Sequence, residues 1–384
     1  MLFRSLDYNG VSMYNSVINK GMVKYHKDLD SIGISAVHRI YSFDNRTALE
    51  ALANVRYYMI RKEFTQNLPY GFSKYKDYST ETNEYTIYKN DYPLSIGYTY
   101  DKYIDNEEYE KLSAIEKQQV MLEAAVLDTK NVKSLAKEDT RSVSDKIKYG
   151  TVTVKSKDGV VVKTDRIRSK KEESTLTLSY EKKKGYEAYL MLDGVITKKP
   201  RIKAKISTDN MEKNIVLRNN DLTYALGRDS YLINLGYSDT SESEDVTFTI
   251  PIEAKINYSD VKVCYVPMDD YVSQIEERNE ESLQNVLTDK NNEVSGNVTL
   301  SSDKVMVFSI PYSSGWKAYV DGKETSVFRA NTMYMGINMT KGSHKVVLRY
   351  NSPGLHLGMM ASAAGIIIWI LLAVASKKKK QKGR

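Results

Sequence analysis

A run of aromatic residues before an Asp-Gly turn is the stretch of this 384-residue chain whose chemistry best fits ligand binding. It comprises Tyr312, Trp316 and Tyr319, followed by Asp321 and Lys323. An aromatic ring can stack on the C–H face of a sugar, and the acid and the amine could hydrogen-bond its hydroxyl groups. The alternative is that Trp316 and Tyr319 are core residues of a sandwich strand, because Trp is usually highly buried. We therefore name these five residues as candidates for carbohydrate contact, while the sequence favours the core alternative for Trp316 and Tyr319.

Signals for catalysis, a metal or a cofactor are weak in the rest of the sequence. The four histidines occur at no metal-ligand spacing, and neither a nucleophile-elbow motif nor a phosphate-binding loop is present. Cys264 is the single cysteine, which excludes an intramolecular disulfide and a cysteine metal cluster, and its apolar strand pattern predicts a core residue. We assign no catalytic residue, no metal and no cofactor from the sequence.

The end of the chain predicts a membrane span. Residues 354–376 contain no Asp, Glu, Lys or Arg, and a helix of this length measures about 34 Å, enough to cross a hydrocarbon core of roughly 30 Å. The tail over 377–384 carries six Lys and Arg residues, which marks the cytoplasmic side. Gly354, Gly358 and Ser362 recur every four residues, so this face could pack against other transmembrane helices or a second copy. The alternative to a membrane span is a buried core helix. The alternative to packing through Gly354, Gly358 and Ser362 is a helix that only anchors the chain.

The distribution of charge and the expected membrane topology limit which kinds of protein this chain can be. The net charge is +7 and the tail supplies six positive charges, so the rest of the chain carries +1, which argues against a nucleic-acid partner. If the tail is inside, residues 1 to about 352 lie outside the cell membrane. The first residues hold no apolar run of a signal peptide. We therefore expect further spans before Met1 in the natural protein, with a tail-anchored cytoplasmic domain as the alternative.

Local patterns predict the elements that position these residues. A short helix over 46–54 is expected with Asp44-Asn45 as its cap, a second helix begins at the capping box Ser113-Ala-Ile-Glu116, and a polar helix spans 269–287. Three dipeptides predict hairpin turns between strands: Asp158-Gly159, Asp321-Gly322 and Lys341-Gly342. A weak repeat places Tyr180 and Tyr186 before Asp193-Gly194, as Tyr312 and Trp316 stand before Asp321-Gly322.

Together these patterns predict an α+β N-terminal subdomain, then a mainly β, β-sandwich-like region, and one C-terminal transmembrane helix. Many short strands at regular spacing are typical of a sandwich. The expected boundaries are a subdomain over 1–130, a sandwich-like domain over 145–267, a helical linker over 268–290, a second β subdomain over 291–352, the span over 354–376 and the tail over 377–384.

Several stretches resemble the YfhO-type family of bacterial multi-spanning membrane proteins. The most specific are residues 308–323 and 341–350, directly before the span, and residues 9–16, 54–58 and 112–118 are similar to other family landmarks. The resemblance covers nearly the whole chain but only the C-terminal half of the family. It implies a likeness to C-type glycosyltransferases, which use a polyprenyl-phosphate sugar, and a role in glycosylating cell-wall polymers such as lipoteichoic acid. The presumed catalytic acid of such proteins lies in their N-terminal half, so no catalytic residue is carried over.

Two functional hypotheses follow. In the first, the chain is the extracytoplasmic C-terminal part of a YfhO-type protein of the bacterial cell membrane, non-catalytic alone, with its status as an enzyme left open. In the second, it is a membrane-anchored scaffold that binds an envelope polymer or protein. The expected partners are the lipid bilayer, other transmembrane helices or a second copy, and a cell-wall glycopolymer or lipid-linked sugar.

Overall fold

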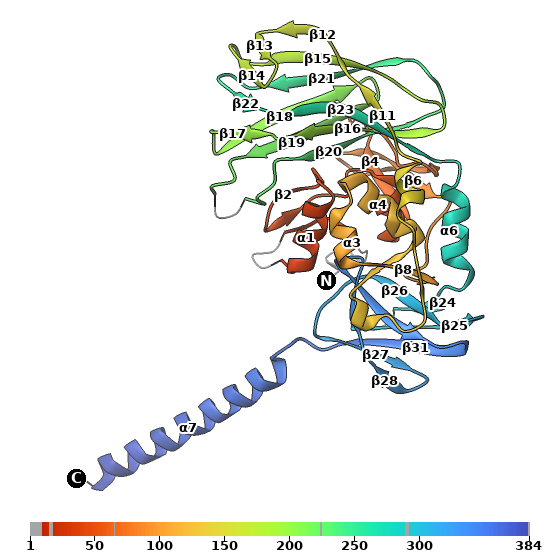
Figure 1. The fold of residues 1–384 in the computed structure, drawn as a ribbon. Coiled ribbons are helices and arrows are strands. Elements are labelled where there is room, and N and C mark those ends of the chain that lie inside the picture. The colour runs from red at the N-terminus through yellow and green to blue at the C-terminus, as the bar shows by residue number, and fades with distance from the viewer. Residues whose placement is uncertain (1–9, 15–17, 65, 223–224, 289–291, 383–384) are drawn as a thin grey trace.

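The computed structural model describes residues 10–14, 18–64, 66–222, 225–288 and 292–382. Figure 1 shows the N-terminal region between a large β-sandwich and a smaller β region, from which a long helix projects. This arrangement confirms the predicted fold class. The first nine residues of the predicted N-terminal subdomain and the last two of the basic tail lie outside the described residues. The domain boundaries stay a prediction.

The N-terminal region consists of short helices and small sheets. Its helices are α1 (Lys20–Asp28), α2 (Thr47–Leu52), α3 (Asn106–Lys111), α4 (Ala114–Glu123) and α5 (Arg141–Ser144), with a 3₁₀ turn at Thr129–Asn131. Two of its sheets have the orders β1 (Met13–Tyr14), β3 (Arg39–Ile40), β2 (Ile34–Ala36), and β10 (Ala136–Lys137), β8 (Lys102–Asp105), β9 (Ala125–Leu127). The predicted capping box of α4 is confirmed, because Ser113 and Glu116 each accept the backbone N–H of the other.

The predicted cap of α2 is wrong. Arg46 occupies the N-cap position without a capping hydrogen bond, and Asp44 and Asn45 both have a left-handed backbone. The Asp44 carboxylate instead lies 2.8 Å from the Lys213 amine in the sandwich. The local pattern predicted that the Asp44 side chain caps the helix, but this side chain forms a long-range ion pair instead.

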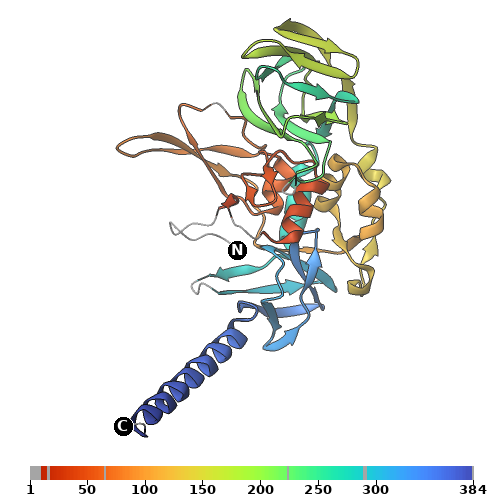
Figure 2. The ribbon, with the colours of Figure 1, turned by 90° about the vertical axis from the view of Figure 1, so that its left-hand side faces the viewer.

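A third small sheet projects from the N-terminal region, with the order β4 (Tyr57–Arg61), β6 (Glu84–Asn90), β5 (Phe72–Ser79). Figure 2 shows it standing away from the body of the molecule. The loop that joins β4 to β5 returns to the sandwich, where it lines the cleft described below.

The sandwich packs two main sheets around one apolar core. The first sheet has the order β11 (Lys148–Thr151), β23 (Asp260–Pro267), β16 (Tyr186–Asp193), β20 (Tyr231–Ser238), and the second β12 (Thr153–Asp158), β15 (Ser174–Glu181), β21 (Ser243–Ile250), β18 (Arg201–Thr208), β19 (Met211–Arg218). A smaller sheet, β13 (Val160–Lys163), β14 (Arg166–Ser169), β22 (Lys255–Asn257), β17 (Ile196–Thr197), completes it. The other face of the first sheet contributes Tyr189, Leu232 and Cys264 to the N-terminal core, which confirms Cys264 as a core residue.

The second β region shares a sheet with the N-terminal region. One sheet has the order β24 (Gln284–Leu287), β25 (Glu293–Leu300), β31 (Gly342–Tyr350), β27 (Trp316–Val320), β28 (Lys323–Thr325), and the other β29 (Phe328–Ala330), β30 (Tyr334–Met339), β26 (Lys304–Pro311), β7 (Gly97–Tyr100). Because β7 pairs with β26, segments some two hundred residues apart in the chain are held in one ladder.

Two of the three predicted hairpins do not form. At Asp158-Gly159, β12 pairs with β15 while β13 pairs with β14 in a different sheet. At Lys341-Gly342, β30 and β31 lie in different sheets, so the turn connects two layers. Both glycines have positive φ, which turns the chain, but longer-range packing selects the partner strand. The hairpin at Asp321-Gly322 is confirmed between β27 and β28.

The polar helix predicted over 269–287 is shorter than expected. It forms α6 (Tyr271–Glu280), and residues 284–287 form strand β24. The buried Leu283 explains the difference, because its backbone N–H donates to the Gly97 carbonyl at 2.8 Å and its side chain joins the second β core. Tertiary pairing has overridden the helical pattern.

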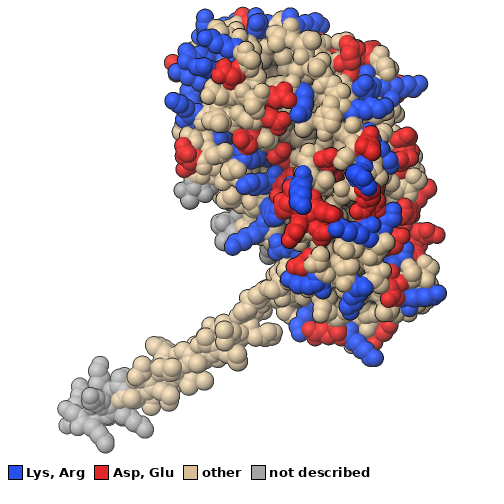
Figure 3. All heavy atoms as spheres, in the orientation of Figure 1, with Lys and Arg blue, Asp and Glu red and all other residues tan. Residues whose placement is uncertain are grey.

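The C-terminal helix α7 (Leu355–Lys382) is long and apolar enough over Leu355–Ala375 to cross a membrane, and none of that stretch is buried. Figure 3 shows no charged side chain along its described surface. A surface this apolar is expected to be covered by lipid or by other apolar helices.

Candidate functional site

The structure divides the predicted aromatic hairpin between two faces of β27. Trp316 packs against the second β core with its ring 5.1 Å from that of Tyr350, and Tyr312 also contacts that core. Tyr319 lies on the opposite face, where the Arg349 guanidinium stands 5.3 Å from its ring centre. The three rings therefore form no common stacking platform.

The turn residues of this hairpin have structural partners. Asp321 has a left-handed backbone, and its carboxylate lies 2.7 Å from His344 Nδ1 and accepts the Lys345 backbone N–H at 2.9 Å. Hydrogen bonding to Asp321 raises the pKa of His344. Lys323 is exposed. Carbohydrate contact at these residues stays a prediction.

The small-residue face of α7 has no neighbour among the described residues. A Cβ added at Gly354 or Gly358 would meet no atom within 4 Å, and Ser362 is exposed. Helix packing through this face stays a prediction.

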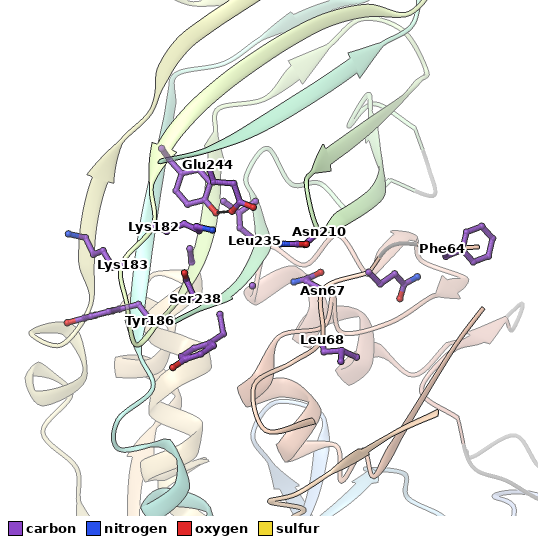
Figure 4. A pocket seen from close by; sticks show the side chains of 15 residues that line it. Phe64, Asn67, Leu68, Lys182, Lys183, Tyr186, Asn210, Leu235, Ser238 and Glu244 are labelled. Atoms are coloured by element: carbon purple, nitrogen blue, oxygen red, sulfur yellow. Dashed lines mark hydrogen bonds between the residues drawn. The ribbon is translucent and has the colours of Figure 1, made fainter. Parts of the chain in front are cut away.

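A different site stands out at the junction of the sandwich and the N-terminal region. A cleft of about 470 Å³ lies between Phe64, residues 66–68 and the ends of β15, β16 and β20, within the size range of small-molecule sites. Figure 4 shows Asn67 and Leu68 on one side of it and Lys182, Ser238 and Glu244 on the other. We call it the Asn67 cleft. It is lined by Phe64, Gln66, Asn67, Leu68, Tyr180, Lys182, Lys183, Tyr186, Ala188, Asn210, Leu235, Gly236, Tyr237, Ser238 and Glu244.

Asn67 is the most informative residue of this cleft. Both polar atoms of its side chain are buried, and neither has a hydrogen-bond partner among the described residues. A buried amide left unpaired costs about 1–3 kcal/mol, so such groups are rare in folded proteins. The amide offers a donor and an acceptor side by side, the combination that adjacent hydroxyl groups of a sugar require.

A hydrogen-bond chain through the backbone holds the Asn67 loop. The Asn67 carbonyl accepts from the Asn45 side chain at 2.6 Å, and the Asn45 carbonyl accepts from the Asn234 side chain at 2.6 Å. Asn234 also donates to the buried Glu187 carboxylate at 3.0 Å. These bonds fix the loop while leaving the Asn67 amide unused.

The Asn67 amide fits in this position because Gly236 has no side chain. Gly236 has φ of 100°, at an irregularity where β20 carries one residue more than β16. A Cβ at this position would lie 3.2 Å from Asn67 Nδ2. Bulges of this kind are common next to functional sites.

Ionic and phenolic groups form the opposite wall. The Tyr180 hydroxyl donates to the Glu244 carboxylate at 2.6 Å, with both residues less than a tenth exposed, and burial is the main cause of a raised Tyr180 pKa. Lys182 lies 3.0 Å from Glu242 at the rim. Tyr237 is 39% exposed, with its ring 4.7 Å from that of Tyr70. An exposed aromatic beside fixed charges and an unpaired amide suits a neutral, hydroxyl-rich ligand.

Sequence reasoning missed most of this cleft. Tyr180 and Tyr186, the counterparts of Tyr312 and Trp316 in the weak repeat, both line the cleft, but the sequence analysis assigned them no site. Asn67 carried no sequence signal, since its unpaired state depends on contacts made across the fold. No group of His, Cys, Asp and Glu within the described part of the chain has the arrangement of a metal site.

Comparisons with known proteins identify relatives of the chain. The family model described as "Bacterial membrane protein YfhO" matches residues 5–362. A curated protein of Bacillus subtilis (strain 168), "Uncharacterized protein YfhO", is 25% identical over 398 residues, which cover 98% of this chain and 42% of that protein. This chain thus spans less than half the length of that relative.

Two solved structures show weak similarity. A family GH115 4-O-methyl-α-glucuronidase aligns with a TM-score of 0.25 and 14% identity, over 31% of this chain and 18% of its own. A mutant of the arabinofuranosyltransferase AftD from Mycobacteria aligns with a TM-score of 0.19 and 15% identity, over 47% of this chain and 14% of its own. TM-scores this low assign neither a common fold nor a common activity.

Proposed function

The chain belongs to the YfhO family of bacterial membrane proteins, and from this premise we propose that it is the extracytoplasmic C-terminal part of a glycosyltransferase-like protein. Its role is to hold carbohydrate during polyprenyl-phosphate-sugar-dependent glycosylation of a cell-wall polymer such as lipoteichoic acid. The tail over 377–384 lies in the cytoplasm, and the chemistry of sugar transfer is supplied by the membrane half that the family resemblance implies.

The unpaired amide of Asn67 is the observation that carries this proposal. A binding site built to pair with a ligand leaves its polar groups unsatisfied when the ligand is absent, and it discriminates strongly against molecules that cannot pair with them. Tyr237 adds an exposed ring for stacking, and the Tyr180–Glu244 pair adds an oriented acid. A sugar uses all three kinds of group, whereas an apolar ligand would leave the amide unpaired.

The test is binding of cell-wall oligosaccharides to the full chain in phosphatidylcholine nanodiscs, measured by saturation-transfer NMR and titration calorimetry. Tyr237→Ala removes the stacking ring and is expected to weaken binding about tenfold, from the loss of an aromatic contact of about 1–1.5 kcal/mol. Tyr149→Ala is the matched control, because Tyr149 is 51% exposed on the same sandwich outside the cleft.

Equal affinity in wild type and Tyr237→Ala would refute carbohydrate stacking in this cleft. Equal weakening in both variants would show that the ligand contacts the sandwich surface in general, and would likewise reject the assignment.

A further inference from the structure

An apolar cavity lies inside the sandwich, apart from the Asn67 cleft. It has a volume of about 390 Å³, and strands of all three sandwich sheets line it. Figure 1 shows the sandwich on the opposite side of the N-terminal region from α7, so the cavity lies away from the expected membrane span. We call it the sandwich cavity.

The register of β12 directs an apolar side chain into this cavity and leaves it accessible to solvent. Val154 stands opposite the core residue Leu178 in the β12–β15 ladder, so both side chains lie on the inner face. Val154 is nevertheless 47% exposed, whereas Leu178 is buried. The register of the two strands shifts directly after Val154, and a bulge of this kind bends the edge strand. The sandwich cavity is therefore open to solvent at the β12 edge.

The smaller sheet adds a continuous apolar row to the wall. Val162 pairs with Ile167 in the β13–β14 ladder, and Ile167 pairs with Ile256 in the β14–β22 ladder. Residues paired in this way point to the same face, and all three line the cavity. Val162 and Ile167 are only partly buried, while Ile256 is buried. Contact with hydrocarbon stabilises such a row, and contact with water does not.

The polar side chains of the described lining gather where the cavity meets solvent. Thr164, Ser259 and Asp260 are exposed and form its mouth. The Tyr258 hydroxyl donates to the Lys163 carbonyl at 2.8 Å, and the Tyr258 ring packs against the apolar core. Among the described residues that line the cavity, Asp260 alone carries a charge. An apolar interior with hydroxyl groups at its entrance matches an amphiphile better than a sugar or an ion.

The interior of the cavity selects hydrocarbon over water. A buried water molecule needs about three polar partners, and the side chains of Leu176, Ala204 and Phe248 in the wall offer none. An alkyl chain needs no polar partner and gains dispersion contacts with every wall that it touches. The occupant that fits the lining is therefore an alkyl chain.

We propose that the sandwich cavity binds the alkyl chain of a neutral single-chain amphiphile, whose head group lies at Thr164 and Ser259. An apolar cavity of about 150 Å³ holds one benzene molecule, so about 390 Å³ accommodates one chain of roughly a dozen carbons and not two. This assignment goes beyond the proposed function, because it does not depend on the Asn67 cleft.

The charges at the mouth determine the kind of head group. An anionic head group would lie beside the Asp260 carboxylate, and like charges repel. A cationic head group would compete with Lys262, whose amine lies 3.4 Å from that carboxylate. A hydroxyl head group meets neither obstacle and can hydrogen-bond Thr164 and Ser259.

The experiment photolabels the full chain in phosphatidylcholine nanodiscs with dodecanol that carries a diazirine. Mass spectrometry identifies the labelled peptides over a range of dodecanol concentrations at a fixed ratio of lipid to protein. Label is expected in the sandwich peptides that contain Val162 or Val261, and α7 is the internal reference because the bilayer surrounds it. Unlabelled dodecanol should compete at the sandwich peptides, and dodecanoate should compete more weakly because of its negative charge.

Two variants block the cavity by different routes. Ala204→Leu fills part of it from β18, and the concentration for half-maximal labelling should rise at least about tenfold, because space for roughly two methylene groups is lost. Thr164→Trp covers the exposed mouth without changing the core, so it tests the same site if Ala204→Leu fails to fold. Lys203→Leu is the matched control, because Lys203 is exposed next to Ala204 and points away from the core. Circular dichroism verifies that each variant folds.

The outcomes separate a specific cavity from general apolar labelling. The proposal predicts loss of sandwich label in the folded blocking variants, wild-type label in Lys203→Leu, and unchanged label of α7 in all of them. It is overturned if the sandwich peptides carry no more label than other peptides outside the span, or if the folded blocking variants label like Lys203→Leu. Equal competition by dodecanoate and dodecanol would refute the neutral head group.

Discussion

Glu50 on α2 offers a test of the buried polar junction that supports the Asn67 cleft. The side chain is fully buried, the Tyr58 hydroxyl donates to one of its carboxyl oxygens, and the other oxygen has no partner among the described residues. Burial raises the pKa of this carboxyl from its ordinary 4.5 to about 8, and the nearby Asp44 carboxylate acts in the same direction. The Tyr58 hydrogen bond opposes the rise without cancelling it.

The sign of the effect follows from proton linkage. Between pH 4.5 and about 8, the folded state binds a proton at Glu50 that the unfolded state has released, so the free energy of unfolding falls as pH rises through this window. Above it, the cost of holding the carboxylate in the interior is fully present. A pKa difference of about 3.5 corresponds to about 5 kcal/mol.

Glu50→Gln isolates this contribution, because glutamine keeps an acceptor for Tyr58 and cannot ionise. Urea unfolding of both proteins in zwitterionic micelles gives the free-energy difference across pH. The variant should match wild type near pH 4, below the window, and exceed it by up to about 5 kcal/mol near pH 9. Glu276→Gln serves as the matched control, because Glu276 is exposed on α6. A pH-independent difference for Glu50→Gln would refute the reasoning.

Three further predictions concern the membrane and the activity. A cysteine in place of Asp158, with Cys264 replaced by alanine, should react with an impermeant thiol reagent in intact cells that also carry the membrane half; labelling only after lysis would reject the extracytoplasmic orientation. The purified chain should transfer no sugar from a polyprenyl-phosphate donor, and turnover above a boiled control would contradict this. Gly358→Leu with Ser362→Leu should lower helix association in a membrane two-hybrid assay while insertion persists, and an unchanged signal would leave α7 as a plain anchor.

Features fixed by local sequence could be predicted. The capping box at Ser113 and Glu116 needs only four consecutive residues, and the span at Leu355–Ala375 needs only its length and composition. The mixture of short helices and strands was also sufficient to predict the fold class. In each case neighbouring residues decide the outcome.

Features decided by distant partners could not be predicted. Gly159 and Gly342 turn the chain as their sequence suggests, but the flanking strands pair elsewhere because other strands compete for their edges. The Asp44 carboxylate pairs with Lys213, 169 residues away, instead of capping α2. The unpaired state of Asn67 depends in the same way on a distant segment, because its amide lies against Gly236 of β20. The residues next to Asn67 in the sequence could not reveal this.

The most direct test of the carbohydrate-binding cleft is to measure stability and affinity together in Asn67→Leu. Leucine fills a similar volume without the amide, so removing an unpaired buried polar group should leave thermal stability unchanged or raise it. The same variant should bind cell-wall oligosaccharide at least about tenfold more weakly than wild type, because the ligand loses its paired hydrogen bonds. A stably folded Asn67→Leu protein that binds the oligosaccharide as tightly as wild type would contradict the account.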